Sequence, residues 1–269
     1  MIPFPRARSG PLPLFGGLAC AIGIGSGCGR LDDISQLISP AVAQGIYVGL
    51  DLPEGTDLSG SGSDLLQYSA ACSVFLAYIA DPSQLDSSPV EGAKVAFKST
   101  ENPGNFALSD EGAGKYLATA EAGISYVSED DAVVTTQIDG SDVRITVQTP
   151  DAPEVDVPTT LPAQGGFTVD LSGQGYDNVL VAVYDVNRGK LTYDNLPDDI
   201  VETYEYTHGE QAESVDVYEE AFQREGSYVV GIAGMRTSDP TTFTGVSQSL
   251  SAFMAGQFTL RFVQVSPLQ

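Results

Sequence analysis

The sequence contains very little histidine, cysteine and tryptophan: one His, three Cys and no Trp among 269 residues. A structural zinc site needs clustered Cys and His ligands. A Ser-His-Asp triad needs a histidine held between a nucleophile and a carboxylate. The one histidine, His208, lies in the polar segment 206–210, which we expect to be an exposed loop. No phosphate loop, dinucleotide fingerprint or metalloprotease motif occurs either. These absences favour a protein that is not an enzyme.

Basic residues are also scarce, with 12 Lys and Arg against 36 Asp and Glu, for a net charge of −24. Residues 1–27 contain Arg6 and Arg8 and no acid. Without them the chain keeps 12 − 2 = 10 basic and 36 acidic residues, a net charge of −26. Such a field repels phosphate backbones, which excludes nucleic acid as a partner.

Acidic residues are abundant, and glycosidases use a pair of them. Candidate pairs occur at 129–131, 198–199 and 219–220, each beside turn-like sequence. Their abundance makes them unspecific, and the sequence has no Trp on which a sugar could stack. An envelope hydrolase or a calcium-dependent carbohydrate-binding protein that uses acidic loops therefore remains only the alternative function.

The N-terminal segment has the layout of a secretory signal, with Arg6 and Arg8 ahead of the apolar stretch 14–24. A membrane-spanning helix needs about 20 apolar residues, so this stretch is too short to span. It ends in Ile24-Gly-Ser-Gly-Cys28, which resembles a bacterial lipobox and implies that Cys28 is lipidated. We predict a signal peptide at 1–27 and a tether at 28–44.

Two alternatives stay open for this segment. Gly25 stands where the lipobox usually has Leu, so an ordinary cleaved signal with an incidental Cys is possible, as is lipidation at Cys20. Gly29 follows the Cys in place of the Asp that retains proteobacterial lipoproteins in the inner membrane. By that resemblance we expect the outer membrane. Cys72 is then the last thiol, and its small, apolar neighbours predict that it is buried and unreactive.

The body of the chain has the pattern of an all-β protein. Apolar residues alternate strictly with polar ones in 143–149 and again in 167–171, as in half-buried strands. Apolar runs at 178–185 and 228–235 indicate further strands. The Pro- and Asp-rich segment 151–158 predicts a linker, so we expect antiparallel immunoglobulin-like β-sandwich domains at 45–150 and 159–269. A barrel remains the alternative.

Two local features refine this expectation. Gly114-Lys-Tyr116 and Gly226-Ser-Tyr228 each follow a polar turn, and both resemble the tyrosine corner of immunoglobulin-like sandwiches. The apolar parity slips at Phe262–Val263, which suggests a β-bulge in the last strand.

A calcium site is the most credible metal site in the sequence. Asp185-Val-Asn187-Arg-Gly189 resembles the start of an EF-hand loop, with Asp185 and Asn187 as ligands. Gly189 stands where a third oxygen ligand would be needed, and no bidentate Glu closes the loop. The competing interpretation is a turn between two strands.

The C-terminal motifs at 204–209, 231–235, 249–256 and 258–265, together with the signal, resemble those of an uncharacterised lipoprotein group of myxobacteria and related delta-proteobacteria. The resemblance implies an address and a fold class but no activity and no site residues. We therefore expect a non-enzymatic cell-envelope lipoprotein with binding or structural β-sandwich modules. It would need no cofactor, would reach the membrane through its lipid, and could bind other envelope proteins or glycans.

Overall fold

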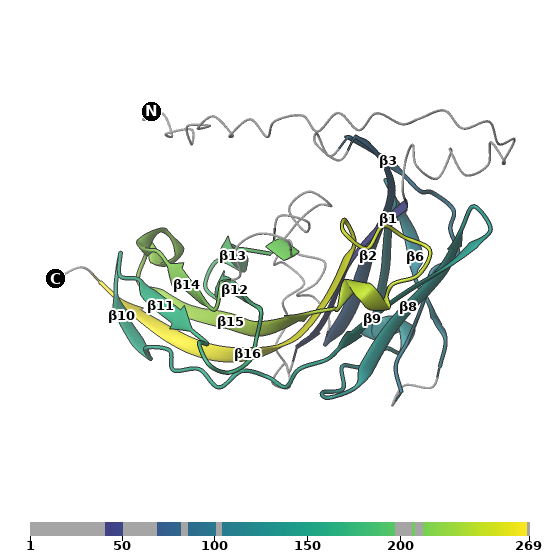
Figure 1. Cartoon of the computed structure of the whole chain (residues 1–269). Helices are drawn as coiled ribbons and strands as arrows, with labels where there is room; N and C mark the ends of the chain where they lie inside the picture. The colour runs from purple at the N-terminus through teal and green to yellow at the C-terminus, as the bar shows by residue number, and fades with distance from the viewer. Residues whose placement is uncertain are drawn as a thin grey trace, which may run out of the picture.

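The computed structural model describes residues 41–50, 69–81, 86–100, 104–196, 206–207 and 212–267 (Figure 1). The chain is mostly β-structure, which confirms the predicted fold class. No helix in these ranges is long and apolar enough to cross a bilayer. The strands and short 3-10 helices are β1 Ala41–Leu50, β2 Ala70–Asp81, β3 Asp86–Pro89, β4 Ala96–Lys98, β5 Phe106–Ala107, β6 Ser109–Gly112, β7 Lys115–Thr119, η1 Ala120–Ala122, β8 Asp131–Ile138, β9 Ser141–Gln148, β10 Thr160–Pro162, β11 Phe167–Asp170, β12 Asn178–Asp185, β13 Lys190–Asp194, β14 Ser214–Val217, η2 Glu219–Phe222, β15 Gly226–Thr237, η3 Pro240–Thr242 and β16 Ala252–Ser266.

One large sheet runs through the whole molecule, with the strand order β13-β12-β15-β16-β1-β2-β7-β6. β10 also pairs with β16, and β3 with β2. β1 is parallel to β16, and residues 44–50 pair with 252–258. The long strands β15 and β16 therefore extend from the part of the molecule near the C-terminus into the part that holds β1 and β2 (Figure 1).

Two small sheets cover opposite ends of one face of the large sheet. The sheet β5-β4-β8-β9 covers one end, and the pair β11-β14 covers the other. On β16, Phe253 and Ala255 pack into the first core, whereas Val263 and Val265 pack into the second. All four are odd-numbered, so in a regular strand they lie on the same face. We call the end with β9 the first lobe and the end with β11 the second lobe.

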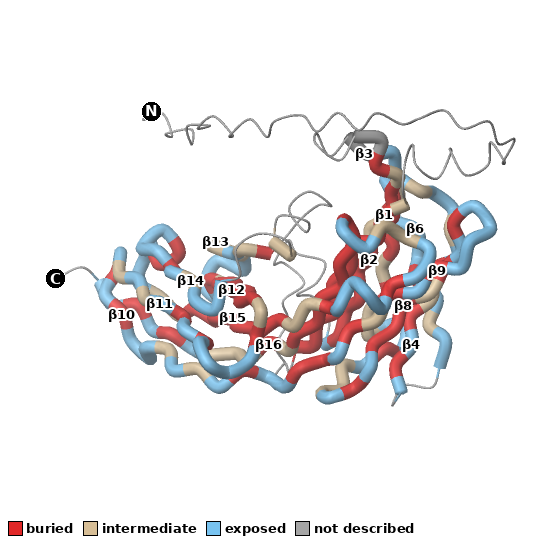
Figure 2. The backbone as a smooth tube through the Cα atoms, in the orientation of Figure 1, coloured by how far each residue is buried: buried red, intermediate tan, exposed pale blue. Residues whose placement is uncertain are grey.

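The predicted alternation of β9 is confirmed. Val143, Ile145 and Val147 are buried in the first core, while Arg144 and Gln148 are exposed. β12 spans the predicted run at 178–185, and β15 includes the run at 228–235. Figure 2 shows buried residues along the strands that the two lobes share.

The opposite face of the large sheet carries a third apolar cluster. It includes Met254 and Phe258 of β16 and Leu180 of β12. The pairing of β15 with β16 runs without a register shift from 254 to 265. The prediction of a bulge at Phe262–Val263 is therefore wrong. The parity slips because Phe258 and Val263 are buried on opposite faces of one regular strand.

Two of the expected boundaries also change. β1 begins at Ala41, so residues 41–44 belong to a strand and not to the tether predicted at 28–44. Residues 151–158 contain no strand. However, 252–258 pairs with β1, so the segments 45–150 and 159–269 share one sheet and do not form two self-contained sandwiches. The Pro- and Asp-rich composition of 151–158 predicted a domain boundary, but long-range strand pairing joins the segments on either side of it.

One of the two predicted tyrosine corners is present, at Tyr228. The Tyr116 hydroxyl donates to the carbonyl of Val90 at 2.7 Å, and Tyr228 donates to the carbonyl of Arg224 at 3.1 Å. Both rings are buried. Tyr228 thus ties the start of β15 to the loop just before it. Tyr116 instead ties the start of β7 to the residue that follows β3, so the corner predicted there is wrong.

Candidate functional site

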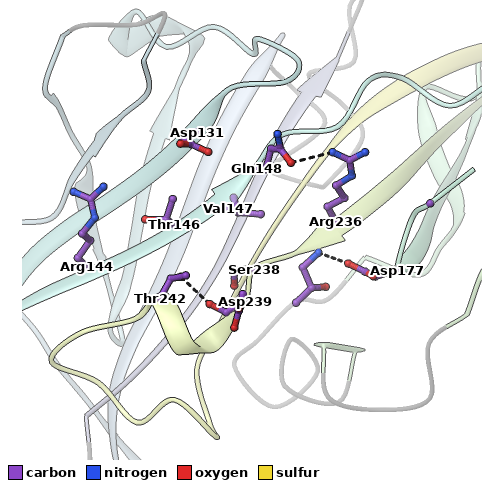
Figure 3. Close-up of a pocket in the computed structure, with 12 residues that line it drawn as sticks. Asp131, Arg144, Thr146, Val147, Gln148, Asp177, Arg236, Ser238, Asp239 and Thr242 are labelled. Atoms are coloured by element: carbon purple, nitrogen blue, oxygen red, sulfur yellow. Dashed lines mark hydrogen bonds between the residues drawn. The ribbon is translucent and has the colours of Figure 1, made fainter.

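A hollow of about 580 Å³ lies where β9 of the first lobe approaches the end of β15 (Figure 3). We call it the notch. Its lining residues are mostly polar or charged, and they come from β8, β9, the β11–β12 loop, β15 and the segment around η3. They are Asp131, Arg144, Thr146, Val147, Gln148, Gly175, Asp177, Arg236, Thr237, Ser238, Asp239 and Thr242.

Two glycines flank Gln257 in the shared sheet, between the two lobes. Gly49 of β1 and Gly234 of β15 both pair with Gln257 of β16. Tyr126 packs over Gly49, where an added Cβ would lie 2.3 Å from the ring. Tyr176 packs over Gly234 in the same way, at 2.4 Å. Only glycine leaves space for both rings at this junction.

The same two tyrosines hold the start of the connector between the halves. Tyr126 donates to the carbonyl of Pro150 at 2.9 Å, and Tyr176 donates to the carbonyl of Asp151 at 3.2 Å. Burial raises the pKa of both phenols, so both remain protonated donors at neutral pH.

The connector is held further along its length. Thr259 of β16 donates to the carbonyl of Pro153 at 3.1 Å. The side chain of Gln174 both accepts from the Glu154 N–H, at 3.2 Å, and donates to its carbonyl, at 2.8 Å. These contacts fix the distance between the lobes and therefore the width of the notch.

Charges of both signs line the notch. Arg236 lies 3.5 Å from a carboxylate oxygen of Glu129 and donates to the side chain of Gln148 at 3.4 Å. Arg144 and Asp131 are exposed, and the side chains of both make no hydrogen bond or ion pair with the residues that the structure describes. Figure 3 shows Arg144 and Arg236 on opposite sides of the site.

Two further carboxylates hold the wall made by the end of β15 and η3. Asp177 accepts from the backbone N–H of Thr237 at 2.7 Å. Asp239 accepts from the hydroxyl of Thr241 at 2.7 Å and from its N–H at 2.9 Å. Those two hydrogen bonds lower the pKa of Asp239, so its carboxylate is charged at neutral pH.

Several residues singled out from the sequence lie outside the described ranges. These are Cys20, Cys28, His208 and the acidic pair at 198–199. Cys72 is described, and it is fully buried in the first core, as predicted. The acidic cluster at 129–131 lies at the notch, whereas Glu219 and Glu220 are exposed in η2.

The calcium candidates Asp185 and Asn187 lie in and beside the β12–β13 turn. Asp185 accepts from the N–H of Arg188 at 3.1 Å, and Asn187 accepts from the N–H of Ser227 at 3.0 Å. The Asp185 side chain therefore stabilises the turn itself, and the Asn187 side chain ties the turn to β15. Across the residues that the structure describes, no group of three or more His, Cys, Asp or Glu could hold a metal ion.

Sequence reasoning missed Arg144, Gln148 and Arg236. The first two have only the signature of outward positions on an alternating strand. Arg236 ends an apolar run, and nothing local indicates that it meets Gln148 of the other lobe. The lining as a whole can form hydrogen bonds and ion pairs with a polar ligand.

Comparison with known proteins yields no family. No family model matches the chain, and no curated protein matches it. Among solved structures, extracellular domains 3–5 of Drosophila OTK are similar at 12% identity and a TM-score of 0.23, covering 85% of this chain and 61% of that one. The four N-terminal Ig domains of Dscam1 isoform 9.44 are similar at 10% identity and a TM-score of 0.18, covering 85% and 46%.

The chain thus spans about three fifths and about half of the lengths of these two structures. Likenesses at this level carry no argument about its function.

Proposed function

We propose that this protein is an exported, lipid-anchored and non-enzymatic binding protein of the bacterial cell envelope, and that the notch is its ligand site. The observation that carries the proposal is the 580 Å³ polar hollow between the two lobes. Ligand pockets typically measure about 300–1,000 Å³ and place a few polar groups around the ligand.

The fixed geometry of the notch supports a binding role. The shared sheet and the held connector keep both walls in place, so little ordering is needed when a ligand enters, which favours affinity. The twelve lining residues include no His, Cys or Lys, and the sequence offers no triad elsewhere. Recognition through hydrogen bonds and charge is therefore the chemistry that the site offers.

The proposed address rests on the N-terminal sequence. Arg6 and Arg8, the apolar stretch 14–24 and Cys28 form the signal that we expect to direct lipidation and outer-membrane anchoring. Metabolic labelling with an alkyne fatty acid tests this part. Wild type should incorporate the label and Cys28→Ala should not. Equal labelling of both would contradict lipid attachment at Cys28.

Site-specific photocrosslinking in cells of the parent bacterium tests the binding part. A photoreactive amino acid at Gln148, inside the notch, should give a discrete adduct. The same amino acid at Lys190, exposed on the edge strand β13, is the control and should not. No adduct at Gln148, or identical adducts at both positions, would contradict a ligand site in the notch.

A further inference from the structure

The open edge of β9 gives the notch backbone hydrogen-bonding groups in addition to its polar side chains. In an antiparallel ladder, alternate residues direct their N–H and C=O groups toward the partner strand and away from it. Arg144 exchanges both backbone hydrogen bonds with Thr244, at 3.2 and 3.1 Å, on the side away from β8. By the same alternation, the backbone groups of Thr146 and Gln148 also face away from β8.

The strand position next to β9 is only partly filled. Thr244 fills it at Arg144, and Gly245 lies so close that an added Cβ would be 2.4 Å from the carbonyl oxygen of Asp142. β9 ends the order of its sheet, and no described residue pairs with Thr146 or Gln148 on this side. Both of these residues line the notch. The notch therefore lies along the edge of β9 directly after the bridge between Arg144 and Thr244.

We propose that an extended segment of a partner polypeptide binds along β9 at Thr146 and Gln148 and inserts a basic side chain into the notch. The proposal rests on the proposed function, because it names the partner class for the same site. Addition of a strand to an exposed sheet edge supplies main-chain hydrogen bonds for affinity and side-chain pockets for specificity.

The charge of the notch selects a basic side chain. Asp131, Asp177 and Asp239 line it, against Arg144 and Arg236. Arg236 is already paired with Glu129, so the remaining balance is negative. The net charge of −24 on the whole chain also attracts a basic partner and repels a second copy of the same chain.

The lining argues against a sugar as the main ligand. None of its twelve residues is aromatic, so a pyranose ring has no surface in the notch on which to stack. A polypeptide needs no such surface, because its backbone pairs with the β9 edge.

A capped hexapeptide of alternating valine and lysine is a suitable probe, and its valine–glutamate counterpart is the control. The protein is the mature chain, residues 28–269, with Cys28→Ser to prevent lipidation, labelled with nitrogen-15. At roughly 1 mM, a concentration that detects weak complexes, the lysine peptide should shift the Thr146 and Gln148 amide signals saturably. The glutamate peptide should leave them unchanged.

Two matched variants test the edge itself. Thr146→Pro removes the outward N–H without removing a β8 ladder bond, and proline is tolerated on such edges. It should weaken binding of the lysine peptide at least about tenfold. Thr146→Val also loses the hydroxyl but keeps the N–H, so it should bind like the parent. If Thr146→Pro fails to fold, Asp131→Asn combined with Asp239→Asn takes its place, and it should weaken binding severalfold.

Three results would overturn the proposal. The first is no shift at these amides, and the second is equal binding of both peptides. The third is unchanged affinity for the lysine peptide in Thr146→Pro or, where that variant fails to fold, in the double variant Asp131→Asn and Asp239→Asn. An adduct from Gln148 in cells together with any of these results would leave the notch as a ligand site and reject the extended basic segment. No adduct and no peptide binding would reject both proposals.

Discussion

Tyrosine hydroxyls donate to backbone carbonyls at several points in the described part of this protein. Tyr116 holds the residue after β3, Tyr228 holds the loop before β15, and Tyr126 and Tyr176 hold the connector. A buried phenol needs a partner for its O–H, and a carbonyl in a loop needs a donor. Each pair meets both needs and fixes a segment that has no strand partner.

Replacing Tyr228 by Phe tests the value of one such bond. Tyr228→Phe removes the donor to the Arg224 carbonyl and leaves the buried ring in place. The free energy of unfolding should fall by about 0.5–1.5 kcal/mol, as for a typical hydrogen bond. Urea denaturation measures it. Tyr218→Phe is the control because Tyr218 is 62% exposed, and it should change little. Equal effects would contradict a specific corner bond.

Cys72 should be inert in the folded protein. It is fully buried in the first core, and burial raises the pKa of its thiol, which suppresses the reactive thiolate. The mature chain with Cys28→Ser should take up iodoacetamide very slowly under native conditions and quickly in urea, as mass spectrometry would show. Rapid native modification would show that the first core is open at this strand.

At the scale of elements, local patterns predicted several strands but not their partners. The alternation of Val143, Ile145 and Val147 gave β9, and the run at 178–185 gave β12. Nothing local predicted that 44–50 pairs with 252–258, because pairing across some two hundred residues depends on the whole fold. The change of apolar parity at Phe262–Val263 led to the wrong prediction of a bulge for a similar reason. The tertiary structure decides which face of a strand other elements cover.

The candidate site was predictable only in part. Its acidic cluster at 129–131 stood out in sequence, although abundance made it unspecific. Arg144 and Gln148 look like ordinary outward strand residues, and Arg236 joins them only through the fold. The open edge of β9 also has no sequence signature, because it depends on which strand fails to pair.

Three aspartates that accept backbone hydrogen bonds should make the free energy of unfolding depend on pH in the acid range. Asp110 accepts from the N–H of Gly92 and of Gly112, Asp170 from Ser172, and Asp239 from Thr241, and these bonds lower the pKa of each carboxyl. A folded pKa below the unfolded value, near 3.9, stabilises the fold above that value. This contribution is lost as pH falls through the folded pKa.

The urea midpoint should therefore fall as pH drops below about 4. A variant with all three residues changed to Asn should lose stability less steeply over the same range, because it has no carboxylate to protonate at these turns. An identical decline in parent and variant would contradict a contribution from these aspartates.

At the scale of the whole molecule, one continuous sheet links two lobes and creates the notch between them. Inter-domain contacts within a chain are usually modest, but here β1 of the first lobe pairs with β16 along 44–50 and 252–258. The connector adds hydrogen bonds from both lobes. The notch should therefore persist only while both halves of the chain are folded together.

Cutting the connector tests this account most directly. A specific protease site inserted between Asp156 and Val157 of the mature chain allows cleavage after folding, in a segment without strands. We predict that the fragments 28–156 and 157–269 remain together in gel filtration and keep the circular dichroism of the uncut protein. Separation into two folded, β-rich fragments would contradict the shared sheet and, with it, a notch of fixed width.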